Sequence, residues 1–218
     1  IIFGTGQQAE IITFYLNKMS VNIFADCIDK KYYKKNFFLN KPVITTDELL
    51  KKNKPDKFNL HIAISYSDLN NLRKEKYLFF KKKGYKMPPI IFNTGRYNSR
   101  FRPGENSVIL ESYIQPYVKI GENSFIWSSS IIGHHTKIKN HCWISSGSAV
   151  GGNCLINNLS FLGMNSTLGH FVNIGASCFI GAGSTVTKDI KKNTLVIQED
   201  SKVLNFDART FLKIRKFK

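Results

Sequence analysis

The side chains best suited to acid–base chemistry in this sequence gather in one short run. Residues 132–141 read IGHHTKIKNH and hold three of the five histidines. A neutral imidazole can accept a proton from an attacking amine or hydroxyl near neutral pH. We therefore predict that His134 is a general base and that His135, which projects in another direction, orients the first ring or faces the substrate. His141 and His170 are expected at the surface or in subunit contacts.

These histidines lie within a sixfold repeat that runs through the second half of the chain. An aliphatic residue returns at every sixth position, which fits neither the period of a helix nor that of a strand. The residues are Val108, Ile114, Ile120, Ile126, Ile132, Ile138, Ile144, Val150, Ile156, Leu162, Leu168, Ile174, Ile180 and Val186. The pattern predicts a hexapeptide solenoid in which three hexads form one triangular coil of about 18 residues. The aliphatic side chains are expected to point into the coil.

A second inward position is predicted four residues after each aliphatic residue, where only small side chains fit. From residue 112 to residue 184 this position is always Ser, Thr, Cys or Val. Three of the four cysteines fall there, so we interpret all four as reduced thiols, which is typical of the cytoplasm. Glycine often follows the aliphatic residue, as at Gly121, Gly133 and Gly151. We expect it to supply corner φ angles that other residues resist.

A repeat of about 18 residues stacks equivalent positions on one face of the solenoid. One outward column then contains Pro116, His134, Gly152, His170 and Lys188. Because Gly152 has no side chain, it is expected to open a slot beside the His134 imidazole, where backbone N–H groups at the coil edge bind an oxyanion. The predicted chemistry is attack of an amine or a hydroxyl on a thioester.

Two other uses of this region are left open by the sequence. Clustered histidines also bind zinc, which would make the chain a hydratase. Two of the three ligands would then have to come from different coils or from a neighbouring chain, and no carboxylate accompanies them, so we predict no metal. The second alternative is a scaffold without catalytic activity.

Residues 1–95 alternate short apolar strands with amphipathic helices, which predicts a Rossmann-like half domain. Its opening turn reads Gly4-x-Gly6-x-x-Ala9, and Asp26 follows near the place where an acidic residue meets a ribose in such folds. About 95 residues are too few for a full dinucleotide domain, so a mononucleotide portion of a substrate is the expected ligand. The alternative is a glycine turn that only packs helix on strand.

The remaining segments complete the predicted organisation. The strand PPIIFN, at residues 88–93, is expected to extend the first domain. Residues 96–107 form a linker, residues 108–190 form the solenoid, and residues 191–218 are expected to cap its open end, as solenoids require.

The chain has 218 residues and a net charge of +17, from lysines scattered over the first hundred residues and the tail. No nucleic-acid recognition motif accompanies them, so we predict no nucleic-acid partner; a basic surface also suits phosphorylated small molecules. No run of about 18 apolar residues is present, so no membrane span is expected. Because the first residue is Ile rather than Met, we expect the natural start to lie upstream.

Four stretches of this sequence together resemble one family. They are the opening FGTGQQAE, the hexads, the segment WSSSIIGHHTKI and the closing IGAGSTVTKDI. The family is that of hexapeptide-repeat sugar acyltransferases of the sialic-acid O-acetyltransferase and bacillosamine-pathway amino-sugar N-acetyltransferase type, and the likeness covers nearly the whole chain. It implies a nucleotide-sugar-binding domain joined to a left-handed parallel β-helix, a homotrimer with active sites between subunits, and acetyl-CoA as cosubstrate.

The resemblance also assigns roles to residues, with His134 matching the base. The positions that match coenzyme contacts are Gly152, Gly163, Met164, Ala182 and Gly183. The positions that match nucleotide-sugar contacts are Gly4, Thr5, Gly6, Gln7, Gln8 and Asp26.

Three departures from the family pattern stand out. His135 replaces the acidic residue that follows the base in many members, and Trp127 stands where many have Asn, although one subgroup shares this Trp. Trp127 is predicted to contact the substrate. Residues 198–201, QEDS, replace a G-x-P-A motif that often lines the adenine end of the coenzyme.

The predicted function is transfer of an acetyl or similar short acyl group from coenzyme A to an amino group of a nucleotide-linked deoxy-amino sugar, in surface-polysaccharide or lipopolysaccharide synthesis. Lys188 is predicted to meet a coenzyme phosphate. The alternative is O-acetylation of a sugar hydroxyl, for example on a sialic-acid-like sugar.

Overall fold

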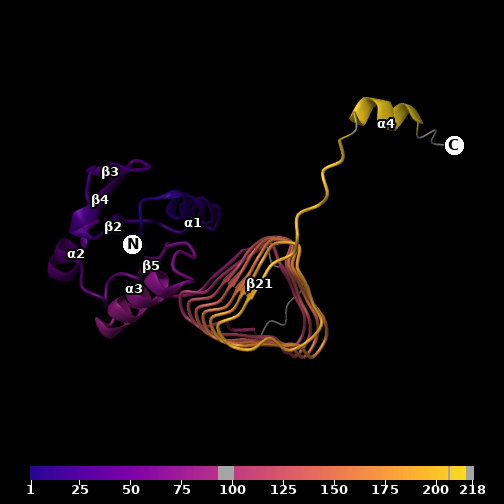
Figure 1. The fold of residues 1–218 in the computed structure, drawn as a ribbon. Coiled ribbons are helices and arrows are strands. Elements are labelled where there is room, and N and C mark those ends of the chain that lie inside the picture. The colour runs from indigo at the N-terminus through magenta and orange to yellow at the C-terminus, as the bar shows by residue number, and fades with distance from the viewer. Residues whose placement is uncertain (93–100, 206, 215–218) are drawn as a thin grey trace.

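A computed structural model describes residues 1–92, 101–205 and 207–214 of the chain. It shows an α/β domain packed against one side of a triangular coil (Figure 1). The prediction of an α/β domain followed by a parallel β-helix is thereby confirmed.

The N-terminal domain is a five-stranded sheet with three helices around it. The order of strands is β3-β4-β2-β1-β5, and all neighbours are parallel except β3 and β4. The elements are β1 (Ile2–Phe3), α1 (Gln7–Lys18), β2 (Asp26–Ile28), β3 (Phe37–Phe38), β4 (Lys41–Thr45), α2 (Thr46–Lys52), β5 (His61–Ile62) and α3 (Asn71–Lys82). A 3-10 turn at Lys30–Tyr32 follows β2.

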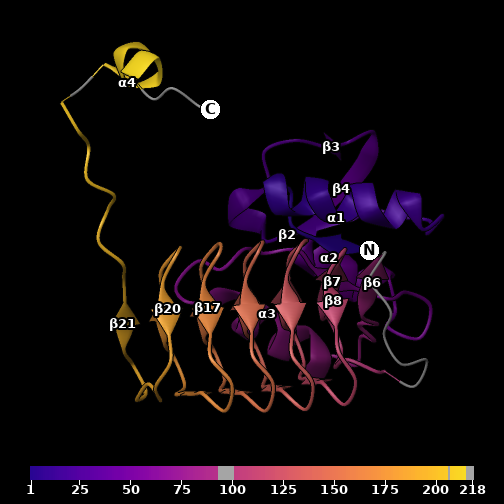
Figure 2. The ribbon, with the colours of Figure 1, turned by 90° about the vertical axis from the view of Figure 1, so that its right-hand side faces the viewer.

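The coil has three walls, each a stack of short parallel strands (Figure 2). The first wall contains β6 (Ile90–Phe92), β7 (Val108–Leu110), β10 (Phe125–Ile126), β13 (Trp143–Ile144), β16 (Phe161–Leu162), β19 (Phe179–Ile180) and β21 (Leu195–Val196). The second contains β8 (Tyr113–Ile114), β11 (Ile131–Ile132), β14 (Ala149–Val150), β17 (Thr167–Leu168) and β20 (Thr185–Val186). The third contains β9 (Lys119–Ile120), β12 (Lys137–Ile138), β15 (Leu155–Ile156) and β18 (Asn173–Ile174).

Stacked strands pair in the predicted register over most of the coil, as in Ile132 with Val150 and Val150 with Leu168. The aliphatic residues from 114 to 186 form one buried cluster inside the walls. The predicted small positions are buried too, and most of their polar side chains bond the next coil; Ser148 Oγ, for example, donates to the Gly163 carbonyl at 3.0 Å. This need for a small donor explains why Ser, Thr and Cys recur there.

The sixfold repeat slips by one residue at its start, which corrects our prediction for Val108. Ile126 pairs with Ile109, so Ile109 fills the inward place and belongs to the cluster inside the coil. Val108 pairs with Phe125 and lies in the cluster outside the first wall. Both neighbours are aliphatic, so the spacing alone could not tell which one points inward.

The corner glycines are needed for a different reason from the one predicted, which was a positive φ angle. Positive φ occurs three residues after the aliphatic position, at Asn123, Asn153 and Asn165 among others, and not at Gly133 or Gly151. These glycines are required by space instead: a Cβ on Gly151 would lie 2.7 Å from the backbone of the next coil. Glycine thus lets successive corners approach one another closely.

The strand PPIIFN does not extend the N-terminal sheet, contrary to the prediction. Strand β6 pairs in parallel with β7 and forms the first edge of the first wall. A short apolar strand carries no signal for which of two parallel sheets it will join. The predicted linker falls partly outside the described residues; its later part already belongs to the coil, since Gly104 N–H donates to the Ile120 carbonyl.

The N-terminal domain covers the outer face of the first wall. Phe125, Trp143 and Phe161 point outward there and share one cluster with apolar residues of α1. Arg73 of α3 is fully buried over this wall, 5.6 Å from the Phe125 ring centroid, and donates to the Asn123 carbonyl at 2.7 Å. These contacts fix the domain against the coil.

The segment after the last hexad only partly follows the predicted cap. Strand β21 pairs with β19 and adds one strand to the first wall. The described chain beyond it then leads away from the coil to helix α4 (Ala208–Ile214) (Figures 1 and 2).

Candidate active site

The His134 imidazole lies where the column of the repeat predicts. It follows β11 at the corner between the second and third walls, and Gly152 follows β14 directly above it. A Cβ on Gly152 would lie 2.7 Å from both Cε1 and Nε2 of His134. The ring therefore occupies space that any other residue at position 152 would fill.

Two neighbours hold this corner. The Gln115 side-chain oxygen accepts from the His134 backbone N–H at 2.9 Å. The Nδ1 atoms of His134 and His135 are 3.1 Å apart, and the His135 ring packs on the Tyr117 ring with centroids 4.6 Å apart. Both imidazoles are solvent-exposed. An exposed ring with Nδ1 hydrogen-bonded and Nε2 unpaired among the described residues suits proton transfer.

The backbone donors predicted for an oxyanion at this corner are already engaged. Gly152 N–H donates to His170 Nδ1 at 3.0 Å, and Gly151 N–H donates to the Leu168 carbonyl. His135 N–H likewise donates to the Pro116 carbonyl. These N–H groups donate hydrogen bonds within the coil, so they are not available to an oxyanion.

His141 is not a surface residue, which corrects the prediction. It is buried between the coil and α3, where its Nδ1 lies 3.0 Å from Asn123 Nδ2 and its ring meets the Tyr77 ring edge-on. Burial, with Lys74 and Arg73 nearby, lowers the pKa of His141 to about 4. A neutral His141 is therefore part of the contact between the two domains.

The residues predicted to contact the coenzyme divide between two corners of the coil. Gly152 and Lys188 share the column of His134, at the corner that follows the second wall. The others follow the first wall, at the corner that precedes the second wall: Gly163, Met164, Ala182 and Gly183. The second wall therefore separates the two groups within one chain.

A hollow of about 450 Å³ opens beside this second group, between the coil and the N-terminal domain. Gln8 and Trp127, both predicted to contact the substrate, line it together with Gly163, Met164 and Ala182. Its apolar wall is formed by Tyr66, Trp143, Phe161 and Phe179. Among the described residues, the N–H groups of Met164 and Ala182 donate no hydrogen bond, so they remain available to a ligand.

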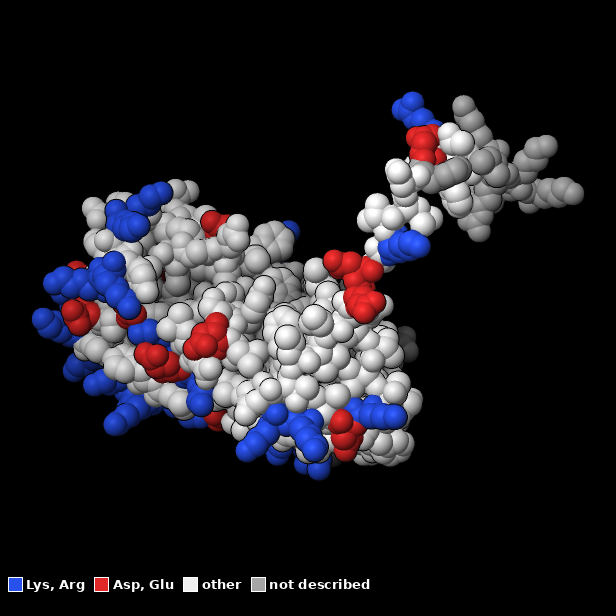
Figure 3. Space-filling model, in the orientation of Figure 1, with Lys and Arg blue, Asp and Glu red and all other residues white. Residues whose placement is uncertain are grey.

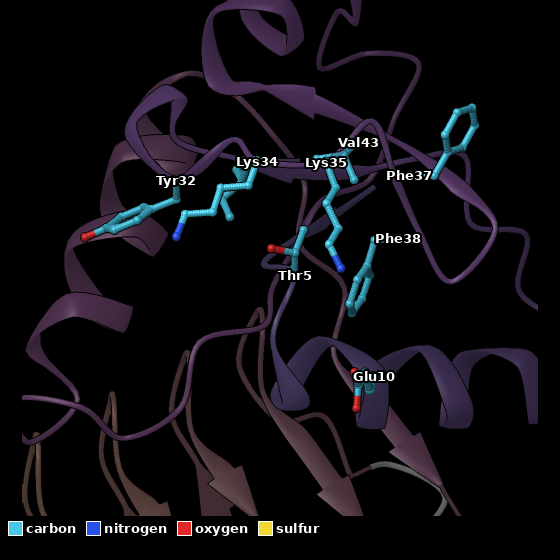
Figure 4. Close-up of a pocket in the computed structure, with 9 residues that line it drawn as sticks. Thr5, Glu10, Tyr32, Lys34, Lys35, Phe37, Phe38 and Val43 are labelled. Carbon is cyan, nitrogen blue, oxygen red and sulfur yellow. The ribbon is translucent and has the colours of Figure 1, made fainter.

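A second pocket, of about 360 Å³, lies on the other side of the glycine turn, which we call the turn pocket. Thr5 lines it from the turn, and Figure 4 shows the ammonium groups of Lys34 and Lys35 on either side of Thr5. The turn leads into the N-terminus of α1, whose first residues lack a side-chain cap. Unpaired N–H groups and two ammonium groups suit a phosphate.

The turn residues thus serve two pockets, with Thr5 in the turn pocket and Gln8 in the hollow. Gly4, at φ +138°, approaches the Ala63 carbonyl so closely that a Cβ would lie 2.7 Å from its oxygen. Gly6 and Gln7 are exposed at the start of α1.

The sequence did not single out Lys34 and Lys35. Lysines are frequent throughout the first hundred residues, and many Lys and Arg side chains lie along the outer edge of the N-terminal domain (Figure 3), so two more lysines give no signal of their own. Their position after β2 in the fold distinguishes them.

Asp26 is placed differently from the prediction. It is fully buried at the start of β2, with no hydrogen-bond partner on either carboxylate oxygen, so it does not face a ligand. Burial raises its pKa to about 6, and the Lys41 ammonium offsets this only in part. Asp29 follows the carboxyl end of β2, where it pairs with Lys76 at 2.7 Å and accepts from Thr46.

Within the described ranges, no group of three His, Cys, Asp or Glu side chains is arranged to hold a metal ion. Cys142, Cys154 and Cys178 are buried at the predicted small positions, and the fourth cysteine, Cys27, is buried in the N-terminal domain. No helix in the described part of the chain is long and apolar enough to cross a membrane.

No protein-family model and no curated protein matches the chain. Its fold is that of solved sugar N-acetyltransferases built from hexapeptide repeats. A histidine-to-asparagine variant of perosamine N-acetyltransferase from Caulobacter crescentus, in complex with CoA and GDP-perosamine, is 22% identical, with a TM-score of 0.79 over 89% of this chain and 90% of that one. The acetyltransferase domain of PglB from Neisseria gonorrhoeae, with acetyl coenzyme A, is 18% identical, with a TM-score of 0.78 over 89% and 93%. WeeI from Acinetobacter baumannii is 18% identical, with a TM-score of 0.67 over 93% and 98%.

The buried carboxyl of Asp26 generates a prediction about stability. In the folded chain the pKa of Asp26 is about 6, above the ordinary value of 3.8. Between pH 3.8 and pH 6 the folded chain therefore keeps a proton on Asp26 that the unfolded chain has lost. This contribution to stability is present below pH 3.8 and is lost as pH rises through 6. Asp26→Asn should therefore raise the melting temperature relative to wild type more at pH 8 than at pH 5.

The exposed Asp56→Asn variant serves as the control for charge and should show no such difference between the two pH values. A gain for Asp26→Asn that is equal at both values, or a loss at pH 8, would contradict the buried placement.

Proposed function

We propose that this protein transfers an acetyl or similar short acyl group from coenzyme A to the amino group of a nucleotide-linked deoxy-amino sugar. One observation carries the proposal: residues expected to meet the sugar substrate, Gln8 and Trp127, line the same hollow as residues expected to meet the coenzyme, Gly163, Met164 and Ala182. Two of the similar solved proteins support it, since one holds CoA with GDP-perosamine and another holds acetyl coenzyme A.

The reaction needs a base and a donor for the oxyanion. His134 Nε2 removes a proton from the sugar amine while the amine nitrogen attacks the thioester carbonyl carbon. The carbon–sulfur bond then breaks, and the imidazolium returns the proton to the coenzyme sulfur. The unengaged N–H groups of Met164 and Ala182 are the donors that we assign to acceptor oxygens of the acyl-coenzyme, because those around Gly152 are occupied.

The turn pocket takes the nucleoside diphosphate of the substrate. Lys34 and Lys35 pair with its phosphates, and Thr5 and the uncapped N-terminus of α1 donate hydrogen bonds to it. From there the sugar passes the turn toward Gln8 and the aromatic wall of the hollow. This path joins the two pockets that the turn separates.

His134 and the hollow lie at the two corners that flank the second wall, so a trimer is needed to bring them together. The outward-facing strand residues of the second wall are uncharged: Tyr113, Ile131, Ala149, Thr167 and Thr185. The third wall instead carries Lys119 and Lys137 on its outer face. We propose a left-handed coil and a cyclic homotrimer with the second wall facing the threefold axis, which sets each His134 corner beside the hollow of a neighbouring chain.

Lys188, in the His134 column, meets a coenzyme phosphate in this arrangement. The proposed location is the cytoplasm, where acyl-coenzyme A and nucleotide sugars are made. O-acetylation of a sugar hydroxyl uses the same base and the same hollow. Incubation with acetyl-CoA and UDP-, dTDP- and GDP-linked amino sugars, followed by mass spectrometry, identifies the substrate, and hydroxylamine lability separates an ester from an amide.

The assigned base gives a prediction for turnover. His134→Ala should lower kcat for acyl transfer at least 100-fold, within the range for loss of a general base, while the melting temperature stays unchanged because the ring is exposed. Lys137→Ala, on the outer face of the same coil, is the control and should retain wild-type kcat. A His134→Ala rate within about fivefold of wild type would place the base elsewhere.

The turn pocket gives a prediction for substrate binding. The double variant Lys34→Ala with Lys35→Ala should raise KM for the nucleotide sugar about tenfold or more, since two charge-assisted contacts to phosphate are lost, and leave KM for acetyl-CoA unchanged. The matched control is Lys51→Ala with Lys52→Ala on α2, which removes the same charge from an exposed helix end. Equal effects of the two double variants would show that only net charge matters.

A further inference from the structure

We infer that His135 is a positioning residue that fixes the proton of His134 on Nδ1 and so leaves Nε2 bare to act as the base. The inference rests on the proposed function, in which His134 is the base, and it adds the residue that sets the tautomer of His134. In the described chain no carboxylate hydrogen-bonds to either ring, so a neutral imidazole takes the orienting role.

The geometry allows only two arrangements of the proton. The two Nδ1 atoms are 3.1 Å apart, which is a hydrogen-bond distance, and two bare nitrogens would repel. Either His134 donates to His135 or His135 donates to His134. In a neutral imidazole only one nitrogen carries hydrogen, so the direction of this bond decides what the other nitrogen can do.

Only the first arrangement leaves Nε2 of His134 able to accept a proton. When His134 Nδ1 donates, its Nε2 carries a lone pair, and this atom lies in the space left open by Gly152. When His135 donates instead, His134 carries its proton on Nε2 and cannot accept another without becoming charged. The structure assigns His135 the role of acceptor because Nε2 is the ring nitrogen of His134 that has no hydrogen-bond partner among the described residues, whereas Nδ1 pairs with His135.

The fold holds the His135 ring in place by two means. Its backbone has φ +60°, the left-handed conformation that recurs at this position of the hexads, and its ring packs on Tyr117 one coil below. Phe171, two coils above, also adopts this conformation with φ +63°. An aromatic residue without a ring nitrogen is therefore compatible with the backbone at position 135.

This compatibility provides the test. His135→Phe keeps the aromatic contact with Tyr117 and removes the acceptor, whereas His135→Asp restores an acceptor that cannot donate when ionised. We expect His135→Phe to lower kcat about 10- to 100-fold with KM for both substrates within about twofold, and His135→Asp to recover most of the loss. Phe171→Leu, at the equivalent position of another coil, is the control and should keep wild-type kcat.

A second readout does not depend on turnover. In protein labelled with ¹⁵N-histidine, with signals assigned from the His134→Ala variant, the Nε2 resonance of His134 should have the shift of an unprotonated nitrogen in wild type and in His135→Asp. In His135→Phe it should move toward the value of a protonated nitrogen. If wild type transfers no acyl group, the proposed function fails while this measurement still tests the histidine pair.

Three results would overturn the inference. One is a kcat for His135→Phe equal to wild type. Another is a His135→Asp variant no more active than His135→Phe, which would mean that position 135 does not act as an acceptor. The third is a protonated Nε2 on His134 in the wild-type protein.

Discussion

The whole site depends on the distance between successive turns of the coil backbone. Strands of neighbouring coils must hydrogen-bond along all three walls, so their corners are forced together, and at several corners no room remains for a Cβ. That closeness makes Gly151 obligatory for packing, and the same repeat puts Gly152 over His134. The His134 imidazole is thus positioned by rigid backbone geometry rather than by a flexible loop.

A second constraint fixes the N-terminal domain. Outward aromatic residues of the first wall and the buried Arg73 hold the domain against the coil, and the two terminal guanidinium nitrogens of Arg73 donate to backbone carbonyls rather than to an acid. This docking brings Gln8 of the glycine turn to the edge of the hollow. The hollow is lined by Gln8 together with residues of the first wall, so it forms because the domain packs on that wall. The glycine turn then lies between the hollow and the turn pocket.

The sequence predicted most strongly what is set by periodicity. The inward positions from Ile114 to Val186, the small buried positions and the stacking of Gly152 over His134 follow from a repeat that stacks, and the structure confirms them. Features that depend on contacts between distant segments, or on choosing between similar neighbouring residues, were not predicted correctly. Val108 and Ile109 are both aliphatic, β6 is too short to reveal which sheet it joins, and the burial of Asp26 and His141 arises from contacts between distant segments. Lys34 and Lys35 were hidden among many other lysines.

The central claim is that one chain supplies His134 and its neighbour supplies the hollow. Mixed trimers test it: a His134→Ala chain is co-expressed with a chain whose hollow is blocked by Ala182→Trp, each inactive alone. Each hybrid trimer then contains one intact junction, and random mixing should restore about a quarter of wild-type activity. If hybrids stay inactive while both variants assemble as trimers, base and hollow do not come from different chains, and the account is wrong.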